Sequence, residues 1–334
     1  MLTSLELFAG GGGVAIASEK AGFTPLLIND IDKYACQTLR VNRPDWNIIH
    51  SPIQNLNFTG YSNVDLLTGG FPCQSFSHSG KREGLADNRG NLFYEFLRAI
   101  KESQPKVFIG ENVKGLLTHN KGKTIEIIYE ELKNLDNYII LDPLLLKAEY
   151  HNVPQKRHRV FIIGIRIDQN HHIFTPPKEK NEVATLEMAL KAGGLYEKDT
   201  PYSNGAKYSE TKRQVLELVP PGKNWNSLPK NIKEEYMGRS LYTQGGKTGM
   251  ARRISWDEPC LTLTCSPTQK QTERCHPDET RPFTIREYAR IQTFPDDWKF
   301  CGSISNQYKQ IGNAVPVNLA YTIINSIKSV LKLN

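Results

Sequence analysis

Short apolar runs alternate with segments of helical periodicity over about the first 170 residues. The runs are followed by glycine, asparagine or charged residues, as the buried strands of a parallel sheet commonly are where they pass into loops. Between the runs, apolar residues recur at helical spacing, most clearly over residues 92–100. This alternation predicts an α/β fold with a mostly parallel, twisted sheet. The strand-like runs are residues 5–8, 25–28, 64–68, 107–110 and 160–165.

Two further apolar runs, residues 138–141 and 144–146, lie on either side of Asp142 and Pro143. Because this dipeptide is typical of turns, we expect the two runs to form a hairpin-like pair.

The regular alternation stops near residue 176, where scattered glycine, proline, lysine and tyrosine take over. Regular patterning returns in a strand-like run at residues 259–264 and in a helix that begins at Thr284, with Glu287 placed to complete a capping box. A last amphipathic helix, reaching about residue 331, is expected to pack back on the first domain. These patterns predict one domain of residues 1–180 plus 305–334 and a second domain of residues 181–304.

The chain of 334 residues carries a net charge of +7. Ten lysines and arginines but only four glutamates lie between Lys207 and Arg253. This local excess is typical of a nucleic-acid-binding segment, although a solvated surface gives the same composition. The six cysteines form no C-x-x-C pair, so neither a zinc ribbon nor a disulfide framework is predicted. No signal peptide and no apolar run of about 18 residues is present, which predicts a soluble, cytoplasmic protein without membrane contact.

The first strand-like run leads into a glycine-rich turn and a helix of small residues. Bare backbone at Gly10 and Gly12 can approach a ligand at the helix N-terminus, as in nucleotide-binding βαβ units. Asp30 ends the second strand, about 20 residues further on, where an acidic side chain can hold ribose hydroxyls. Asp32 is placed to cap the next helix. A nucleotide-like cofactor is therefore expected at this turn.

A thiol and a carboxyl group follow two other predicted strands. Cys73 comes after the run at 64–68, in a loop of glycine, proline, serine and histidine, and Glu111 comes after the run at 107–110. Ligands bind at the carboxyl edge of open α/β sheets, so both groups are candidates for chemistry. A buried carboxyl group at this edge could donate a proton. On the loop alone, Cys73 could equally be a small core residue, as many free cysteines are.

Gln155, Arg157 and Arg159 alternate along the entry to the run at 160–165. Because side chains repeat every two residues in a strand, we expect the three to share one face. Two guanidinium groups directed together would suit an anion or a carbonyl-bearing base.

These motifs, in this order, resemble those of DNA C5-cytosine methyltransferases of the bacterial restriction–modification type. The resemblance covers about the first 170 and the last 55 residues, and the segment from about 180 to 260 corresponds to the family's variable target-recognition domain. The matching motifs are Leu7-Phe8-Ala9-Gly10, Phe71-Pro72-Cys73-Gln74, Glu111-Asn112-Val113, Gln155-Lys156-Arg157-His158-Arg159, Arg286-Glu287 and Gln310-Ile311-Gly312-Asn313.

The resemblance implies a Rossmann-like methyltransferase fold, S-adenosyl-L-methionine as cofactor and a specific double-stranded DNA sequence as substrate. Cys73 would add to C6 of a flipped-out cytosine, and Glu111 would engage the N3 and N4 edge. Arg159 would hold O2 of the base, and Arg157 would support the site electrostatically. The loop from Ser75 would close over the base. No metal is implied.

The resemblance also implies a set of cofactor-binding positions. One of them departs from the family's pattern, because Asp30 stands where glutamate is usual. Next to another, Ser51-Pro52-Ile53 replaces Gly-Asp-Ile, so an adenine hydrogen bond is missing or replaced. The positions are Phe8, Ala9, Gly10, Gly12, Asp30, Ile31, Ile53, Gly70, Pro72, Leu92 and Asn313.

Other functions compete with DNA methylation. The tRNA-modifying branch of the same family shares the catalytic residues, and a catalytically silent DNA-binding relative would share the basic segment. A nicotinamide oxidoreductase would explain the glycine turn but neither Cys73 nor the basic second domain. We expect a protective methylase that acts as a monomer and requires no physical contact with a partner endonuclease.

Overall fold

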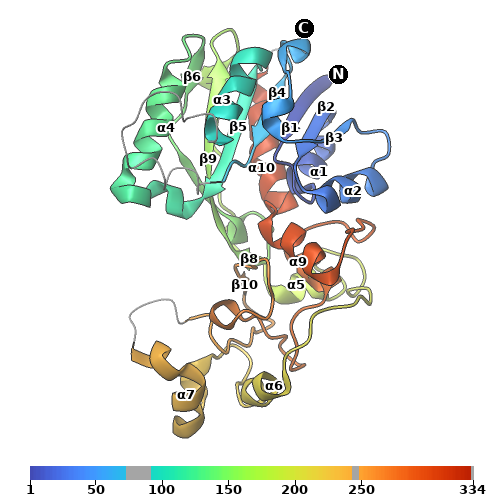
Figure 1. Ribbon diagram of the computed structural model, residues 1–334, viewed down its shortest axis with the longest axis vertical. Coiled ribbons are helices and arrows are strands. Elements are labelled where there is room, and N and C mark those ends of the chain that lie inside the picture. Colours follow the sequence, from blue (N-terminus) through green and yellow to red (C-terminus); the bar gives the residue numbers. More distant parts are fainter. Residues whose placement is uncertain (73–91, 243–247, 332–334) are drawn as a thin grey trace. The chain divides into compact units, whose positions relative to one another are not determined.

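A computed structural model describes residues 1–72, 92–242 and 248–331 (Figure 1). The chain divides into two compact units, each formed from separate stretches of sequence. The boundary at Lys178 lies where the sequence pattern changes. In contrast to the expected domains, residues 148–157 and 305–316 group with the second unit. The assignment of one domain to catalysis and the other to target recognition stays a prediction. The first unit comprises Met1–Lys147, His158–Lys178 and Val317–Asn334, and the second comprises Ala148–Arg157 and Glu179–Pro316.

An eight-stranded sheet forms the centre of the first unit, in the order β3-β2-β1-β4-β5-β9-β6, with β7 also paired to β9. The neighbours from β3 to β5 are parallel, and β9 pairs antiparallel with β5. This confirms the predicted α/β class with a mostly parallel sheet. The strands are β1 (Leu2–Leu7), β2 (Phe23–Asp30), β3 (Ile48–His50), β4 (Leu66–Gly69), β5 (Val107–Val113), β6 (Tyr138–Ile140), β7 (Leu144–Lys147) and β9 (His158–Arg166).

The expected hairpin around Asp142 and Pro143 is wrong. Both β6 and β7 pair antiparallel with β9, at successive positions along it: Tyr138 lies opposite Arg166, and Leu144 lies opposite Phe161. Each of the two short strands hydrogen-bonds to the long, buried β9 and not to the other. Sequence proximity and a turn-forming dipeptide could not reveal this partner.

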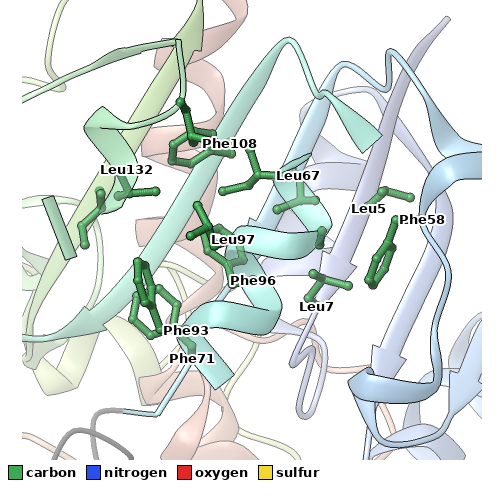
Figure 2. Close-up of a cluster of buried hydrophobic side chains, with 14 of the residues drawn as sticks. Leu5, Leu7, Phe58, Leu67, Phe71, Phe93, Phe96, Leu97, Phe108 and Leu132 are labelled. Carbon is green, nitrogen blue, oxygen red and sulfur yellow. The ribbon is translucent and has the colours of Figure 1, made fainter. Parts of the chain in front are cut away.

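Helices cover both faces of the sheet (Figure 1). On one face, α3 and α4 bury an apolar core that includes Leu5, Leu67, Phe96 and Phe108 (Figure 2). The terminal helix α10 packs against α1, which confirms that both ends of the chain build this unit. The helices are α1 (Gly13–Lys20), α2 (Lys33–Asn42), α3 (Leu92–Ser103), α4 (Lys123–Lys133) and α10 (Val317–Ile327).

The second unit is built from short elements, with β8 and β10 paired in parallel. The capping box is confirmed: Thr284 Oγ1 accepts from the main-chain NH of Glu287, whose carboxylate accepts from the main-chain NH of Thr284 at 2.7 Å. Three short helices in residues 186–237 were not predicted. The elements are β8 (Gln155–Lys156), α5 (Leu186–Leu190), α6 (Glu210–Glu217), α7 (Lys230–Met237), β10 (Cys260–Leu261), α8 (Ile285–Ile291) and α9 (Ile304–Asn313).

Several cations of the basic segment hold this unit together. Lys212 Nζ lies 2.8 Å from the fully buried carboxylate of Glu273, which also accepts a hydrogen bond from Tyr236 Oη at 2.6 Å. Arg252 pairs with Glu258 at 2.6 Å. Arg253 is buried and donates to main-chain carbonyls. The net charge therefore overstates the number of cations left to meet an external anion.

Across the described residues, none of the helices combines the length and apolar character needed to cross a membrane.

Candidate active site

The glycine-rich turn joins β1 to α1. Gly10 and Gly12 have positive φ angles of 53° and 95°, and Phe8, which also has a positive φ of 56°, starts the turn. The main-chain NH of Ala9 donates to the carbonyl of Asn29 at 3.0 Å, so the turn is tied to the end of β2. A methyl group built on Gly10 would meet nothing within 4 Å. The backbone therefore faces open space here, as an approaching ligand requires.

The Asp30 carboxylate holds this turn from β2. Its Oδ2 accepts from the main-chain NH of Gly10 at 2.7 Å, and its Oδ1 accepts from the main-chain NH of Asp32 at 2.7 Å. Burial raises the pKa of Asp30 against these hydrogen bonds. A carboxylate has about four acceptor sites, so Asp30 can still accept from a further donor such as a ribose hydroxyl. Asp32 caps α2 as predicted, since its side chain accepts from the main-chain NH groups of Tyr34 and Ala35.

An apolar side chain lies open next to this carboxylate. Ile31 is 68% exposed, whereas Ile53, at the start of a 3-10 turn (Ile53–Asn55), is 3% exposed and belongs to the core. Only Ile31 can therefore offer its side chain to a ligand without rearrangement. Acceptors on Asp30, open backbone at Gly10 and the apolar surface of Ile31 together fit a nucleoside-bearing group such as S-adenosylmethionine.

Glu111 and Arg159 form an ion pair on the sheet. Glu111 lies within β5, not beyond it as the sequence suggested, because the strand continues to Val113. Arg159 is opposite Val113 in the register, so Glu111 and Arg159 are diagonal neighbours on one face. Arg159 Nε lies 2.7 Å from Oε1 of Glu111, and the side chains are 10% and 16% exposed. The ion pair fixes the positions of both side chains.

The segment before Cys73 is fixed against this pair. A methyl group built on Gly70 would lie 3.0 Å from Glu111 Oε2, so a side chain there would crowd the carboxylate. The carbonyl of Phe71 accepts from Asn112 Nδ2 at 2.8 Å. The Phe71 ring packs against Phe93 and Phe96, with centroids 5.4 and 5.5 Å away (Figure 2).

Cys73 and the loop to residue 91 lie outside the described residues. Pro72, which directly precedes Cys73, is exposed. Leu92, the first residue of α3, is half-buried and packs on the core. The described residues on both sides of this loop thus belong to the first unit, which also holds Glu111 and Arg159.

Gln155, Arg157 and Arg159 alternate with more exposed residues, as expected: all three are buried, whereas Lys156 is exposed and His158 is half-buried. The strand is interrupted at Arg157, between β8 and β9, so the shared face itself stays a prediction. In the second unit, Gln155 Oε1 accepts from the main-chain NH of Leu263, and Arg157 donates to main-chain carbonyls. The two guanidinium groups therefore have different partners, Arg159 a carboxylate and Arg157 main-chain oxygens.

Asn313, the last residue of α9, also lies in the second unit. Its side-chain Oδ1 accepts from the thiol of Cys265, with sulfur and oxygen 2.9 Å apart. Sequence reasoning did not single out Cys265. No motif marks it, and the two residues are 48 positions apart.

The mostly parallel sheet, the glycine turn and the acidic residue that ends β2 define a Rossmann-like nucleotide-binding fold. A family model for C-5 cytosine-specific DNA methylases matches residues 2–329, and the chain belongs to this family. It is 55% identical over 335 residues to the Type II methyltransferase M.Eco47II of Escherichia coli, covering 99% of this chain and 80% of that protein. It is 50% identical over 329 residues to M.Sau96I of Staphylococcus aureus, covering 96% and 74%.

Solved structures share the fold. Dnmt2 methyltransferase of S. pombe matches with a TM-score of 0.65 at 19% identity, over 98% of this chain and 99% of that one. A DNA modification methyltransferase encoded in an E. coli prophage matches with a TM-score of 0.70 at 24% identity, over 99% of both chains. The enzyme therefore methylates C5 of cytosine in DNA with S-adenosyl-L-methionine as methyl donor. This confirms the expected family, activity and cofactor, and excludes the nicotinamide oxidoreductase.

Proposed function

We propose that Cys73, Glu111 and Arg159 carry out the reaction on a cytosine flipped out of duplex DNA. The observation that carries this assignment is the Glu111–Arg159 ion pair, with Gly70 packed against the carboxylate three residues before Cys73. A paired carboxylate and guanidinium on one face of two neighbouring strands offer complementary groups to the polar edge of a base.

The bonds change in two stages. The Cys73 sulfur adds to C6 while Glu111 donates a proton toward N3, and this makes C5 an electron-rich carbon that can accept a methyl group. S-adenosylmethionine supplies that methyl group when bound. The C5 proton then leaves to solvent, the Cys73 thiolate departs from C6, and N3 returns its proton to Glu111, which restores the aromatic ring and the free enzyme. Arg159 holds O2 of the base throughout, where negative charge develops during the addition.

For the cofactor, we assign the turn at Phe8, Ala9, Gly10 and Gly12 to binding through its backbone. Asp30 would accept from the ribose hydroxyls, and Ile31 would pack on the adenine. Gly70, Pro72, Leu92 and Asn313 complete the proposed set, and Ile53 supports it from the core. The exposure of Ile31 and the open space beside Gly10 support this assignment. Pro52 has no side-chain donor or acceptor, so the adenine is held here without the family's usual aspartate.

For the substrate, we assign residues 181–304 to recognition of a specific duplex sequence. The two relatives reported above are Type II methyltransferases, which supports a protective role beside a restriction endonuclease. One flipped base needs one active site, so a cytoplasmic monomer that makes no physical contact with the endonuclease is sufficient.

Sequencing of methylated cytosines in plasmid DNA tests this function directly. DNA from cells that express the protein should contain 5-methylcytosine at one short, recurring sequence, and DNA from cells that express Cys73→Ser should not. Methylation of tRNA with no new methylcytosine in DNA would contradict the proposed substrate.

A further inference from the structure

One guanidinium group holds the main chain on both sides of Asn313. Arg157 is 2% exposed, and its Nη2 donates to the carbonyl of Gly312 at 2.8 Å and to that of Ala314 at 3.0 Å. Its Nη1 donates to the carbonyl of Leu263 at 3.1 Å. Arg157 thereby ties the end of α9 to the segment that follows β10.

These two segments also touch backbone to backbone. A methyl group built on Gly312 would lie 2.4 Å from the carbonyl oxygen of Thr264 and 2.9 Å from the main-chain nitrogen of Cys265. The hydroxyl of Tyr288 donates to the same Thr264 carbonyl at 3.0 Å. These contacts hold the main chain next to Asn313 in place, because neither segment can shift without losing them.

The thiol of Cys265 fixes the side chain of Asn313. Its sulfur donates to Oδ1 across 2.9 Å. Desolvation raises the pKa of Cys265, so the thiol stays protonated and able to donate at neutral pH. With Oδ1 engaged, the amide directs its NH₂ group away from Cys265, and that group can only donate.

We propose that Arg157 and Cys265 are positioning residues for the cofactor, acting through Asn313. Arg157 sets the main chain on either side of Asn313, and Cys265 sets the amide so that its NH₂ group meets a hydrogen-bond acceptor of S-adenosylmethionine. This inference rests on the proposed assignment of Asn313 to the cofactor site. It gives Arg157 a role in cofactor affinity that does not require contact with the cytosine.

The Cys265 arm of the test compares Cys265→Ala, Cys265→Ser, Asn313→Ala and the double variant Cys265→Ala/Asn313→Ala. Affinity for S-adenosylmethionine is measured by titration calorimetry, and KM for DNA is measured separately. Cys265→Ala should weaken cofactor affinity by about threefold to tenfold, the range of one neutral hydrogen bond. Cys265→Ser keeps a donor and should restore most of the affinity. KM for DNA should not change.

The double variant separates positioning from a structural role. If Cys265 acts through Asn313, removing its thiol should have little further effect once the amide is gone. Two results would overturn the inference. One is a double variant whose loss of cofactor affinity equals the sum of the losses in Cys265→Ala and Asn313→Ala. The other is an equal loss of cofactor affinity in Cys265→Ser and Cys265→Ala.

The Arg157 arm uses Arg157→Lys, which keeps the charge but cannot donate to three carbonyls in the same fixed geometry. Positioning predicts weaker cofactor binding by about tenfold, with the single-turnover rate at saturating cofactor largely kept. Retained cofactor affinity together with a changed single-turnover rate would instead show that Arg157 acts on the base. Thermal melts identify any variant that fails to fold, and the Cys265 variants test the proposal independently.

The outcomes also separate this inference from the proposed function. If Asn313→Ala binds S-adenosylmethionine as tightly as the unmodified enzyme, Asn313 does not belong to the cofactor site, and both proposals fail at that residue. If Asn313→Ala weakens binding but Cys265→Ala and Arg157→Lys do not, the cofactor assignment stands and the positioning inference is overturned.

Discussion

Arg159 donates from Nε to Oε1 of Glu111 across 2.7 Å, from a diagonal position on the neighbouring antiparallel strand. The pair is largely buried, and desolvation lowers the pKa of Arg159 although Glu111 opposes that shift. Each partner therefore holds the other in a fixed direction. Such a pair can offer an acceptor and donors to one base without moving.

Replacing Glu111 should separate binding from chemistry. Glu111→Gln keeps the shape but cannot deliver a carboxylic proton, so we expect kcat to fall by about 10²- to 10⁴-fold. Affinity for cofactor should not change, since Glu111 is not among the assigned cofactor residues and glutamine fills the same space beside Gly70. Single-turnover methylation and cofactor titration measure the two effects. An unchanged methylation rate would remove Glu111 from its assigned role.

Gly70→Ala should lower activity without unfolding the protein. The added methyl group would lie 3.0 Å from Glu111 Oε2, and displacing that carboxylate by a few tenths of an ångström should reduce kcat by about tenfold. Gly60→Ala is the matched control, because a methyl group there meets nothing within 4 Å. Equal kcat values for the two variants, with equal melting temperatures, would show that Gly70 does not act through Glu111.

Asp30 should make cofactor affinity depend on pH. Its pKa is raised, chiefly by burial, so the carboxylate loses an acceptor when the pH falls through that pKa, and binding should weaken. The stability of the free protein should change with the opposite sign. A native carboxyl group with a raised pKa binds protons before the unfolded one does, so its contribution to stability declines as the pH rises. In Asp30→Asn, both cofactor affinity and stability should depend less on pH, and calorimetric titration at several pH values measures the affinity. If cofactor affinity of the unmodified enzyme depended on pH in the same way as that of Asp30→Asn, this role of Asp30 would be contradicted.

Glu273 should be essential to the second unit. Its buried carboxylate pairs with Lys212 and accepts from Tyr236, and Glu273→Ala would leave the cation without its partner. We expect unfolding of this unit to become easier by about 3–5 kcal/mol. Glu187→Ala, which removes the exposed pair with Lys191, should cost about 1 kcal/mol or less. Denaturant titration of both variants compares them, and equal midpoints would refute the structural role of Glu273.

The local part of the fold was predictable from the sequence. The strand runs, the Asp32 cap and the capping box at Thr284 all depend on neighbours within a few positions, and the structure confirms them. The order of motifs was enough to identify the family. Such local elements can be predicted because short-range hydrogen bonds and side-chain alternation determine them.

What the sequence could not reveal depends on distant partners. Nothing local indicates that Arg157 bonds to residues 106 to 157 positions away. The hairpin at Asp142 failed for the same reason, since β9 competes for both strands. The Cys265–Asn313 hydrogen bond likewise requires the folded second unit.

Covalent catalysis by Cys73 is the central claim, and trapping the adduct tests it most directly. A duplex carrying fluorine in place of hydrogen at C5 of the target cytosine cannot lose that atom as a proton, so the enzyme should remain attached after methyl transfer. Mass spectrometry should place the bond at Cys73, and Cys73→Ser should bind the same DNA but form no adduct and transfer no methyl groups. Full methyl transfer by Cys73→Ser, or an adduct at another residue, would contradict the account.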